Sequence, residues 1–275
     1  MLRLMLILVL LVIIVVGLIF IHFEQEFHRD VHLALQQNKA QTGDLLLEKD
    51  LEHLPPPVQR YLRFVGVVNQ PKVKNIRIVF KGQMRDKGKD WFPFTSEQYN
   101  GFEKYTRLFF MKGKMFGLTV PGYHAYQNKN ASMRIKLFGL FPIVSVQGNE
   151  LFKAETVTIF NDMCLLAPAT LIDSRIRWET IDDTTARASF TNEGVSIQAT
   201  LYFNARGQLV NFVSDDRYAV SDMKRYRFST PITDYKNFNG INVISFGEAV
   251  WHYPDGEFVY GKFELQEIVY NVEPF

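Results

Sequence analysis

The chain opens with an unbroken apolar stretch over residues 4–21, in which Gly17 is the one residue that weakens a helix. As a helix this stretch extends for about 27 Å, close to the ~30 Å hydrocarbon core of a bilayer. A cleaved signal peptide has a shorter apolar region that small residues follow. Here His22, Phe23 and Glu24 follow instead. The pattern therefore predicts an uncleaved transmembrane anchor over residues 1–23.

The charges on either side of this stretch predict its orientation. Arg3 and the α-amino group precede it, whereas Glu24, Glu26 and Asp30 follow it together with Arg29. Because positive charges tend to stay on the cytoplasmic side, we expect the N-terminus in the cytoplasm. The rest of this single-pass protein of the cell membrane is then expected outside, in the periplasm or the extracellular space.

Residues 24–50 are polar with scattered apolar positions, among them Phe27, Val31, Leu33 and Leu35. A mixed composition of this kind, with no strand-like alternation, favours a helix that is largely solvated. We interpret the segment as a membrane-proximal helical stalk that lies outside the core.

Three consecutive prolines at positions 55–57 mark the next boundary, because proline is tolerated in the first turn of a helix but not further in. Val58, Tyr61 and Leu62 then recur at helical spacing, and Gly66 is placed to cap the end. The pattern predicts a short amphipathic helix over residues 56–66, near the start of a β-rich soluble domain that covers residues 51–275.

From residue 73 onwards the apolar positions recur at every second residue, which is typical of strands. The clearest case is the segment 195–203, in which apolar residues alternate with polar residues and tyrosine. Asn239-Gly240 favours a tight hairpin turn, and short connections of this kind make neighbouring strands antiparallel. We predict strands within residues 73–147 and 174–272.

Residues 150–166 break the strand pattern. Ile159 and Met163 are spaced as on one side of a helix, Asn149 is placed to cap its start, and Pro168 stops it. We therefore predict one central helix between two runs of strands.

The ratio of helices to strands predicts the architecture. Antiparallel strands with an apolar face need that face covered. One central helix and one short helix are too few to cover about nine to eleven strands laid out as a flat sheet. The fold class is therefore predicted as α+β, mostly antiparallel β, with the sheet curled into an open or incomplete barrel. We expect the central helix across its mouth or concave side, an arrangement that commonly leaves a cavity.

Composition narrows the possible functions. The chain has 31 basic and 29 acidic residues, a net charge of +2, and no long run of one sign. This balance argues against nucleic acid, which usually requires a basic stripe. Cys164 is the only cysteine, so no internal disulfide can form. Because it lies beside Leu165 and Leu166, we interpret it as a core residue rather than a nucleophile.

Two clusters of charged residues lie on predicted strands. Asp215-Asp216-Arg217 follows a strand and suits a ligand cluster, an acid–base pair, or an ion pair between Asp216 and an arginine that anchors a strand end. Arg225 and Arg227 share one face of a strand, a geometry that suits a phosphate or carboxylate headgroup. It equally suits pairing with acidic residues of adjacent strands such as Glu248.

The histidines and the known catalytic motifs give little support for an enzyme. His28 and His32 have a spacing that can bind zinc when a third ligand joins, but no HExxH pattern is present and we predict no metal site. His124 and His252 could meet in space. The sequence contains no nucleophile elbow, phosphate loop, dinucleotide fingerprint or cysteine-pair metal motif. We therefore predict no catalytic residues and no cofactor.

Aromatic residues crowd between positions 91 and 126. They suit the lining of an apolar pocket or a membrane-facing lip, and equally an ordinary β core. The candidate ligand-binding residues are Trp91, Phe94, Phe110, Tyr123, Tyr126, Trp178, Arg217, Arg225, Arg227 and Trp251.

A set of short motifs in the C-terminal half resembles an uncharacterised bacterial family of single-pass membrane proteins with a domain of unknown function. The matching residues are Leu137 to Pro142, Glu155 to Ile172, Trp178, Thr184 to Ala188, Gly207, Asp216 to Tyr218, Pro231, Gly240, Glu248 to Trp251, Asp255 to Phe258, Tyr260, Tyr270 and Asn271. Cys164-Leu165 departs from the family pattern, which has a tryptophan there. The resemblance implies an anchored envelope protein, with no known activity, and a looser analogy of shape to the half-barrel lipoprotein carriers of the bacterial envelope.

Three functions follow from these observations. The first is a binding module, whose curled sheet encloses an apolar or lipid-like ligand beside the membrane. The second is a non-catalytic interaction module of the envelope, with a solid core and an exposed apolar patch. The third is a hydrolase without a recognisable motif, which predicts that groups such as Asp216, His124 or His252 converge in one cleft with perturbed pKa values.

Overall fold

The computed structural model describes residues 2–38, 44–115 and 117–274, and thirteen strands in this part of the chain form one sheet. The sheet order is β6-β5-β4-β3-β2-β1-β13-β12-β11-β10-β9-β8-β7, and every neighbouring pair is antiparallel. The strands are β1 Asn75–Met84, β2 Phe92–Gly101, β3 Thr106–Met115, β4 Leu118–Gln127, β5 Asn130–Leu137, β6 Phe141–Gln147, β7 Ile176–Asp182, β8 Thr185–Asn192, β9 Val195–Phe203, β10 Leu209–Ala219, β11 Lys224–Phe238, β12 Ile241–Tyr253 and β13 Gly256–Tyr270.

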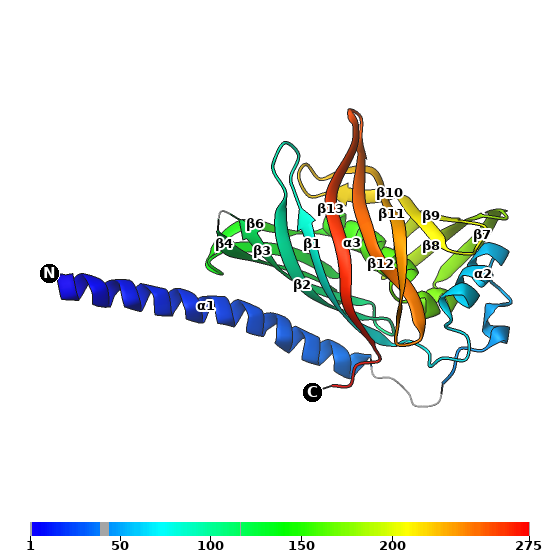
Figure 1. The fold of residues 1–275 in the computed structure, drawn as a ribbon, viewed down its shortest axis with the longest axis horizontal. Coiled ribbons are helices and arrows are strands. Elements are labelled where there is room, and N and C mark those ends of the chain that lie inside the picture. Colours follow the sequence, from blue (N-terminus) through cyan, green and yellow to red (C-terminus); the bar gives the residue numbers. More distant parts are fainter. Residues whose placement is uncertain (1, 39–43, 116, 275) are drawn as a thin grey trace.

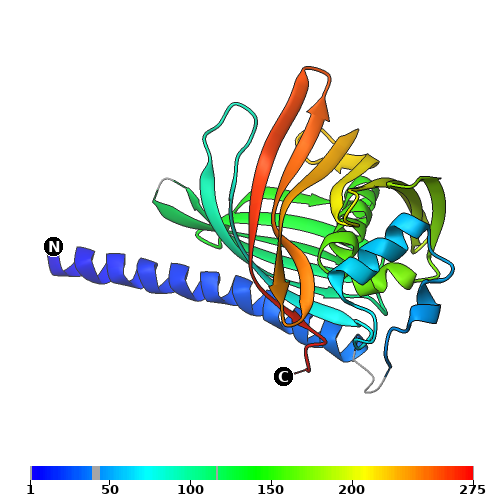
Figure 2. The ribbon, with the colours of Figure 1, turned by 45° about the vertical axis from the view of Figure 1, so that its right-hand side comes forward.

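The order of the strands explains how the sheet is covered. β1 pairs with β13 in the middle of the sheet, so β6 and β7 become its two edges. The segment between β6 and β7 consists of helix α3, Asn149–Leu165, and the short 3-10 helix η2, Pro168–Ile172. To join the two edges, α3 crosses the hollow of the curled sheet, as Figures 1 and 2 show. This confirms the predicted curled antiparallel sheet with one central helix.

Helix α3 is buried around most of its circumference, because the sheet curls round it. Its apolar residues join the main core, including Phe160 and Met163, which are fully buried. The predicted cap was wrong in one detail. Asn149 is the first helical residue, and the cap position belongs to Gly148, whose φ of 120° places it in the region that favours glycine. Cys164 is buried within this core, and burial raises the pKa of its thiol well above the ordinary value.

The short helices pack at one end of the sheet. Helix α2 runs over Pro56–Val65 and follows the 3-10 helix η1, Glu48–Leu51. The side chains of Val58, Tyr61 and Leu62 are fully buried, which follows from their helical spacing. Gly66 ends α2 at φ 80°, the left-handed conformation expected of a C-terminal glycine cap.

The N-terminal helix packs on the opposite, convex face of the sheet. Helix α1 spans Leu2–Gln37; its N-terminal half projects beyond the sheet, and its C-terminal half lies along β2 and β3 (Figure 1). Phe27, Val31 and Leu35, one helical turn apart, are buried against the sheet, whereas Leu33 is 49% exposed. The prediction that the stalk lies outside the core was therefore wrong for this part of residues 24–50. An apolar stripe at every fourth residue requires a partner, and the convex face supplies it.

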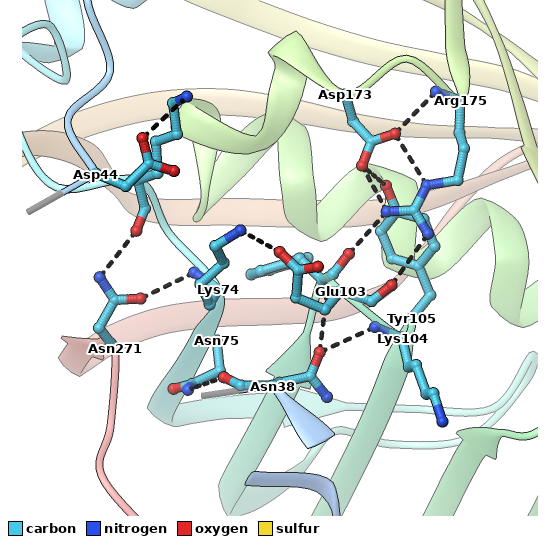
Figure 3. Close-up of polar contacts among 12 residues, drawn as sticks. Asn38, Asp44, Lys74, Asn75, Glu103, Lys104, Tyr105, Asp173, Arg175 and Asn271 are labelled. Atoms are coloured by element: carbon cyan, nitrogen blue, oxygen red, sulfur yellow. Dashed lines mark hydrogen bonds and ion pairs between the residues drawn. The ribbon is translucent and has the colours of Figure 1, made fainter. Parts of the chain in front are cut away.

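The end of α1 is fixed to the base of the sheet by Asn38 (Figure 3). Its side-chain oxygen accepts hydrogen bonds from the backbone N–H groups of Glu103, at 2.9 Å, and Lys104, at 3.1 Å. Asn75 donates to the Asn38 carbonyl at 2.9 Å. Gly101 lies directly against the Asn38 side chain, so a Cβ at this position would clash with it. Close approach of the helix end to the turn between β2 and β3 therefore requires glycine here.

The predicted anchor, residues 4–21, forms the N-terminal half of α1. Among the residues that the structure describes, no helix is both long enough and apolar enough to cross a membrane. Most side chains of the stretch lie outside the described part. Of those that are described, Met5, Leu6, Ile7 and Ile21 are exposed. The anchor and the orientation of the chain stay predictions of the sequence.

Candidate functional site: a cavity between the helix and the concave face

A cavity of about 510 Å³ lies between α3 and the concave face of the sheet. Residues of three hairpins line one end of it, namely those between β1 and β2, β10 and β11, and β12 and β13. These hairpins project from the same side of the molecule in Figure 1. Asp86, Lys87 and Ser221 in this rim are exposed, so the cavity opens to solvent between the hairpins. Its volume lies in the range of sites that hold small molecules.

Most of the cavity wall is apolar. Strands β3, β4 and β5 supply one side, with Phe109, Met111, Met133 and Ile135. The other side consists of aromatic and aliphatic residues from β1 and β11–β13, which are Phe80, Phe228, Ile244, Ala249, Trp251, Tyr260 and Phe263. An apolar wall suits an apolar molecule better than a polar substrate. Because methionine is flexible, this wall can adapt to apolar ligands of different shape.

A network of buried polar and charged side chains joins β2 and β3 to α3 beside the cavity. Arg107 donates from Nε to Asp162 Oδ2 at 2.8 Å and from one terminal nitrogen to Glu155 Oε2 at 3.1 Å. Gln98 and Asn100 donate to the same Asp162 oxygen at 2.7 and 3.0 Å. All five side chains are buried. Buried charges need hydrogen-bonded partners of opposite charge, because an unpaired buried charge lowers the stability of the fold by several kcal/mol.

The environment of Glu155 keeps it ionised. Burial opposes ionisation, but the neighbouring imidazole of His124 and the positive charges of Arg107 and Arg217 outweigh it and hold the pKa of Glu155 at about 2. His124 Nδ1 lies 3.7 Å from the carboxylate. Within the described part of the chain, no hydrogen bond joins His124 to a hydroxyl or a thiol. The geometry therefore places two acids around Arg107, with His124 beside one of them.

Arg217 forms a separate feature of the wall. Its guanidinium carbon lies 4.1 Å from the ring centre of Phe228 and 4.9 Å from that of Trp251. One terminal nitrogen donates to the Tyr260 hydroxyl at 2.8 Å. Its Nε is buried and has no hydrogen-bond partner.

The sequence-predicted site residues fall into separate regions. Arg217 and Trp251 line the cavity. Phe94 and Tyr126 belong to the concave core, where Tyr126 stacks on Phe152 with ring centres 4.8 Å apart. Trp178 packs at the margin of this core and donates to the Leu171 carbonyl at 3.3 Å.

The remaining predicted residues lie away from the cavity. Phe110 and Tyr123 are buried on the convex face under α1, in contact with Phe27. Trp91 lies outside the lining, beside the rim residue Arg85, whose guanidinium carbon is 4.4 Å from its ring centre.

The arginine pair expected to bind a headgroup is engaged at the surface. Arg225 and Arg227 are 53% and 57% exposed. Arg225 pairs with Asp216 at 3.3 Å, and Arg227 pairs with Asp215 at 2.9 Å. Lys153 of α3 also pairs with Asp216, at 2.9 Å. Of the two readings that the sequence left open, ion pairing is the one observed, with Asp215 and Asp216 as partners in place of Glu248.

Sequence reasoning missed the buried network around Arg107. The signal was present in the alternation of β2, where Gln98 and Asn100 occupy positions that share a face with Phe94. Polar residues at positions that the alternation assigns to the interior indicate a buried polar network. Of the polar groups named for a hydrolase, His124 lines the cavity, whereas Asp216 and His252 do not. His252 instead bonds to Ser229 at 2.8 Å.

Comparisons with solved structures found chains of related shape. One is a LolA superfamily protein from Nitrosomonas europaea, with 10% identity over 77% of this chain and 92% of that chain and a TM-score of 0.44. Another is a domain named for outer membrane lipoprotein sorting, from Vibrio parahaemolyticus, with 8% identity over 78% of this chain and 90% of that chain and a TM-score of 0.44. A third is a beta-barrel-like protein of a domain of unknown function from Brucella abortus, with 8% identity, coverage of 72% and 98%, and a TM-score of 0.25.

The comparison with curated proteins gave no match. The comparison with protein families gave one over most of the chain, across residues 44–263. This range begins after α1 and includes α3, the cavity wall and the buried network. The chain therefore belongs to the family of unknown function DUF6544.

Proposed function

We propose that the protein binds an apolar, lipid-like molecule in the cavity between α3 and the concave face of the sheet. The observation that supports this proposal most directly is the cavity. About 510 Å³ of space remains beside a core that is otherwise closely packed, and its wall is mostly aromatic, aliphatic and methionine side chains. A space of this size exposes apolar surface, and burial of apolar surface is worth about 25 cal/mol per Å². An apolar ligand gains that free energy.

The other functions considered from the sequence fit the geometry less well. An interaction module with a solid core does not match a cavity of this volume. A hydrolase would need its polar groups within reach of a substrate, yet Asp216 and His252 lie outside the cavity. The low pKa of Glu155 also makes this carboxylate a weak base.

Native mass spectrometry of the full-length chain, followed by solvent extraction and lipid analysis, tests the binding proposal. We expect a hydrophobic molecule bound at near one per chain. Thr158 on α3 lines the cavity, so Thr158→Phe narrows it and should reduce the bound mass. The matched control is Thr180→Phe on β7, where Thr180 is exposed. A wild-type chain that carries no apolar molecule, and that binds neither a fluorescent fatty acid nor its neutral ester, would overturn the proposal.

We also propose that the apolar half of α1 attaches the protein to the cell membrane, with the sheet outside. Support comes from the sequence of residues 4–21 and from the charges around it. Such an attachment would bring the cavity close to a source of lipid. Fractionation tests it, since the full-length chain should stay in the membrane pellet at high pH and a chain without residues 2–21 should leave it. Release of both chains alike contradicts the attachment.

A further inference from the structure

Arg217 is a charged side chain of the cavity wall that forms no ion pair among the described residues. Among the ion pairs formed by the described residues, none includes Arg217, although this residue lines the cavity. The aromatic rings of Phe228 and Trp251 and the hydroxyl of Tyr260 fix its position. Its Nε is buried without an acceptor, which in a folded protein calls for an explanation.

A guanidinium held in this way is suited to one class of ligand. Its planar fork of N–H groups matches the two oxygens of a carboxylate or the oxygens of a phosphate. The stacked rings prevent the side chain from turning toward water, so little rotamer entropy remains to be lost when an acid binds. Because the cavity excludes much of the solvent, the attraction between the two charges is stronger there than at the surface.

The acidic residues of the cavity do not compete for Arg217 at close range. Asp162 and Glu155 are paired with Arg107, and His124 Nδ1 lies 3.7 Å from Glu155. Glu248 lies 3.8 Å from Lys262. Glu155 and Asp162 thus share Arg107 and Glu248 lies nearest Lys262, so none of the three forms an ion pair with Arg217.

The rim holds a second arginine that forms no ion pair among the described residues. Arg85 stacks on Trp91 and donates to the Val259 carbonyl at 2.9 Å, without a carboxylate partner among the described ion pairs. Lys87 pairs with Asp255, and Asp86 is exposed to water. An anion that enters between the hairpins thus passes Arg85 before it reaches Arg217 on β10, two residues before that strand ends.

We infer that the ligand is an anionic amphiphile, whose carboxylate or phosphate binds Arg217 while its hydrocarbon chain lies against the methionine-rich wall of β3–β5. The inference rests on the proposed function and adds the chemical class of the ligand. The acid headgroup pairs with the terminal nitrogens of the Arg217 guanidinium, and Met111, Met133 and Ile135 accept the chain.

The test compares an acid with its neutral ester on the same protein. The full-length chain is titrated with cis-parinaric acid and with its methyl ester at pH 8, against blanks of the same detergent. We expect the wild type to bind the acid about tenfold more tightly than the ester, the size of one charge-assisted hydrogen bond. Arg217→Gln should remove this preference and leave the affinity for the ester within about twofold. Arg217→Lys, which keeps the charge and loses the fork, should restore part of it.

Arg227→Gln is the matched control, because Arg227 lies on the neighbouring strand β11 but is exposed and paired outside the cavity. It should leave both affinities unchanged. Competition with dodecanoate and with dodecyl phosphate then distinguishes a carboxylate from a phosphate headgroup. Equal affinities of the wild type for acid and ester, unaltered in Arg217→Gln, would refute the anionic headgroup and leave lipid binding intact. Failure of both probes to bind would refute lipid binding itself.

Discussion

The two faces of strands β2–β4 carry similar side chains, but one face borders the cavity and the other packs against α1. Phe109 lines the cavity, whereas its neighbour Phe110 lies under α1. On β4, His124 faces the cavity and Tyr123 packs against α1. The convex face is closed, because Phe27 approaches Phe110 and Tyr123 with ring centres 5.4 and 5.6 Å apart. Aromatic content alone therefore does not distinguish a ligand site from a solid core. Whether a face forms a ligand site or a solid core depends on the element that covers it.

The charges of the two faces differ in the same way. On the convex side, Arg134 pairs with Glu26 of α1 at 2.8 Å, and both side chains remain about a quarter exposed, at 27% and 26%. On the concave side, Arg107 and its acidic partners are buried. Water can replace a lost partner on the convex face, whereas on the concave face the remaining charge has only protein and cavity around it. Three predictions follow from this contrast, and the first two compare a concave residue with a matched residue of the convex face.

The largest effect is expected from removal of the central cation on each face. Arg107→Leu leaves Glu155 and Asp162 without their shared partner and should lower the free energy of unfolding by about 3–5 kcal/mol. Arg134→Leu, the convex control, should lower it by about 1 kcal/mol or less, since Glu26 regains water. Urea unfolding followed by tryptophan fluorescence measures both. Equal losses in the two variants would show that the buried network has no special energetic role.

The second effect is a dependence of stability on pH. The pKa of Glu155 is about 2 in the folded protein, below the ordinary value of 4.5. Since the folded pKa is depressed, the stabilisation is complete above about pH 4.5 and is lost as the pH falls toward 2. From the size of this shift it amounts to about 3 kcal/mol at neutral pH. Glu155→Gln should thus unfold more easily than the wild type at pH 7, and the difference should shrink on acidification.

Glu26 on the convex face is the control for this titration. Burial opposes its ionisation, but the hydrogen bond and charge of Arg134 lower its pKa as well. Because Glu26 is partly exposed, its contribution is screened by water. Glu26→Gln should therefore leave most of the loss between pH 5 and pH 2 in place. If Glu26→Gln made the stability insensitive to acid while Glu155→Gln stayed sensitive, the acid response would come from the convex face and the prediction would be wrong.

The architecture could be predicted from the sequence because local patterns determine it. A single buried helix between two runs of strands cannot cover a flat sheet of this size, so curling follows from the count of elements alone. The sequence also indicated that α1 packs against another element, since Phe27, Val31 and Leu35 recur at every fourth residue. It was missed because a stripe of this kind shows that a helix has a partner, without showing which face provides it.

The site could be predicted only in part, because strands alternate. Residues 91–126 are rich in aromatics on both faces, and each step along a strand moves the side chain to the other face. Phe110 and Tyr123 were thus grouped with cavity residues although they lie under α1. The network of Arg107, Glu155 and Asp162 joins a strand to a helix that follows about fifty residues later. Contacts between residues so far apart in the sequence give only a weak local signal, which here is the presence of polar residues at interior positions of β2.

The smallest effect separates the headgroup site expected from the sequence from the one that the cavity offers. Arg225 and Arg227 share an ion-paired surface, and both are more than half exposed. Exposed pairs contribute about 0–1 kcal/mol each, so the double variant Arg225→Gln/Arg227→Gln should change the free energy of unfolding by about 1 kcal/mol or less. Its affinity for cis-parinaric acid should stay within about twofold of the wild type, measured by fluorescence titration. A tenfold loss of acid binding in this variant, with the ester unaffected, would move the headgroup to the outer surface and require the hydrocarbon chain to enter the cavity from there.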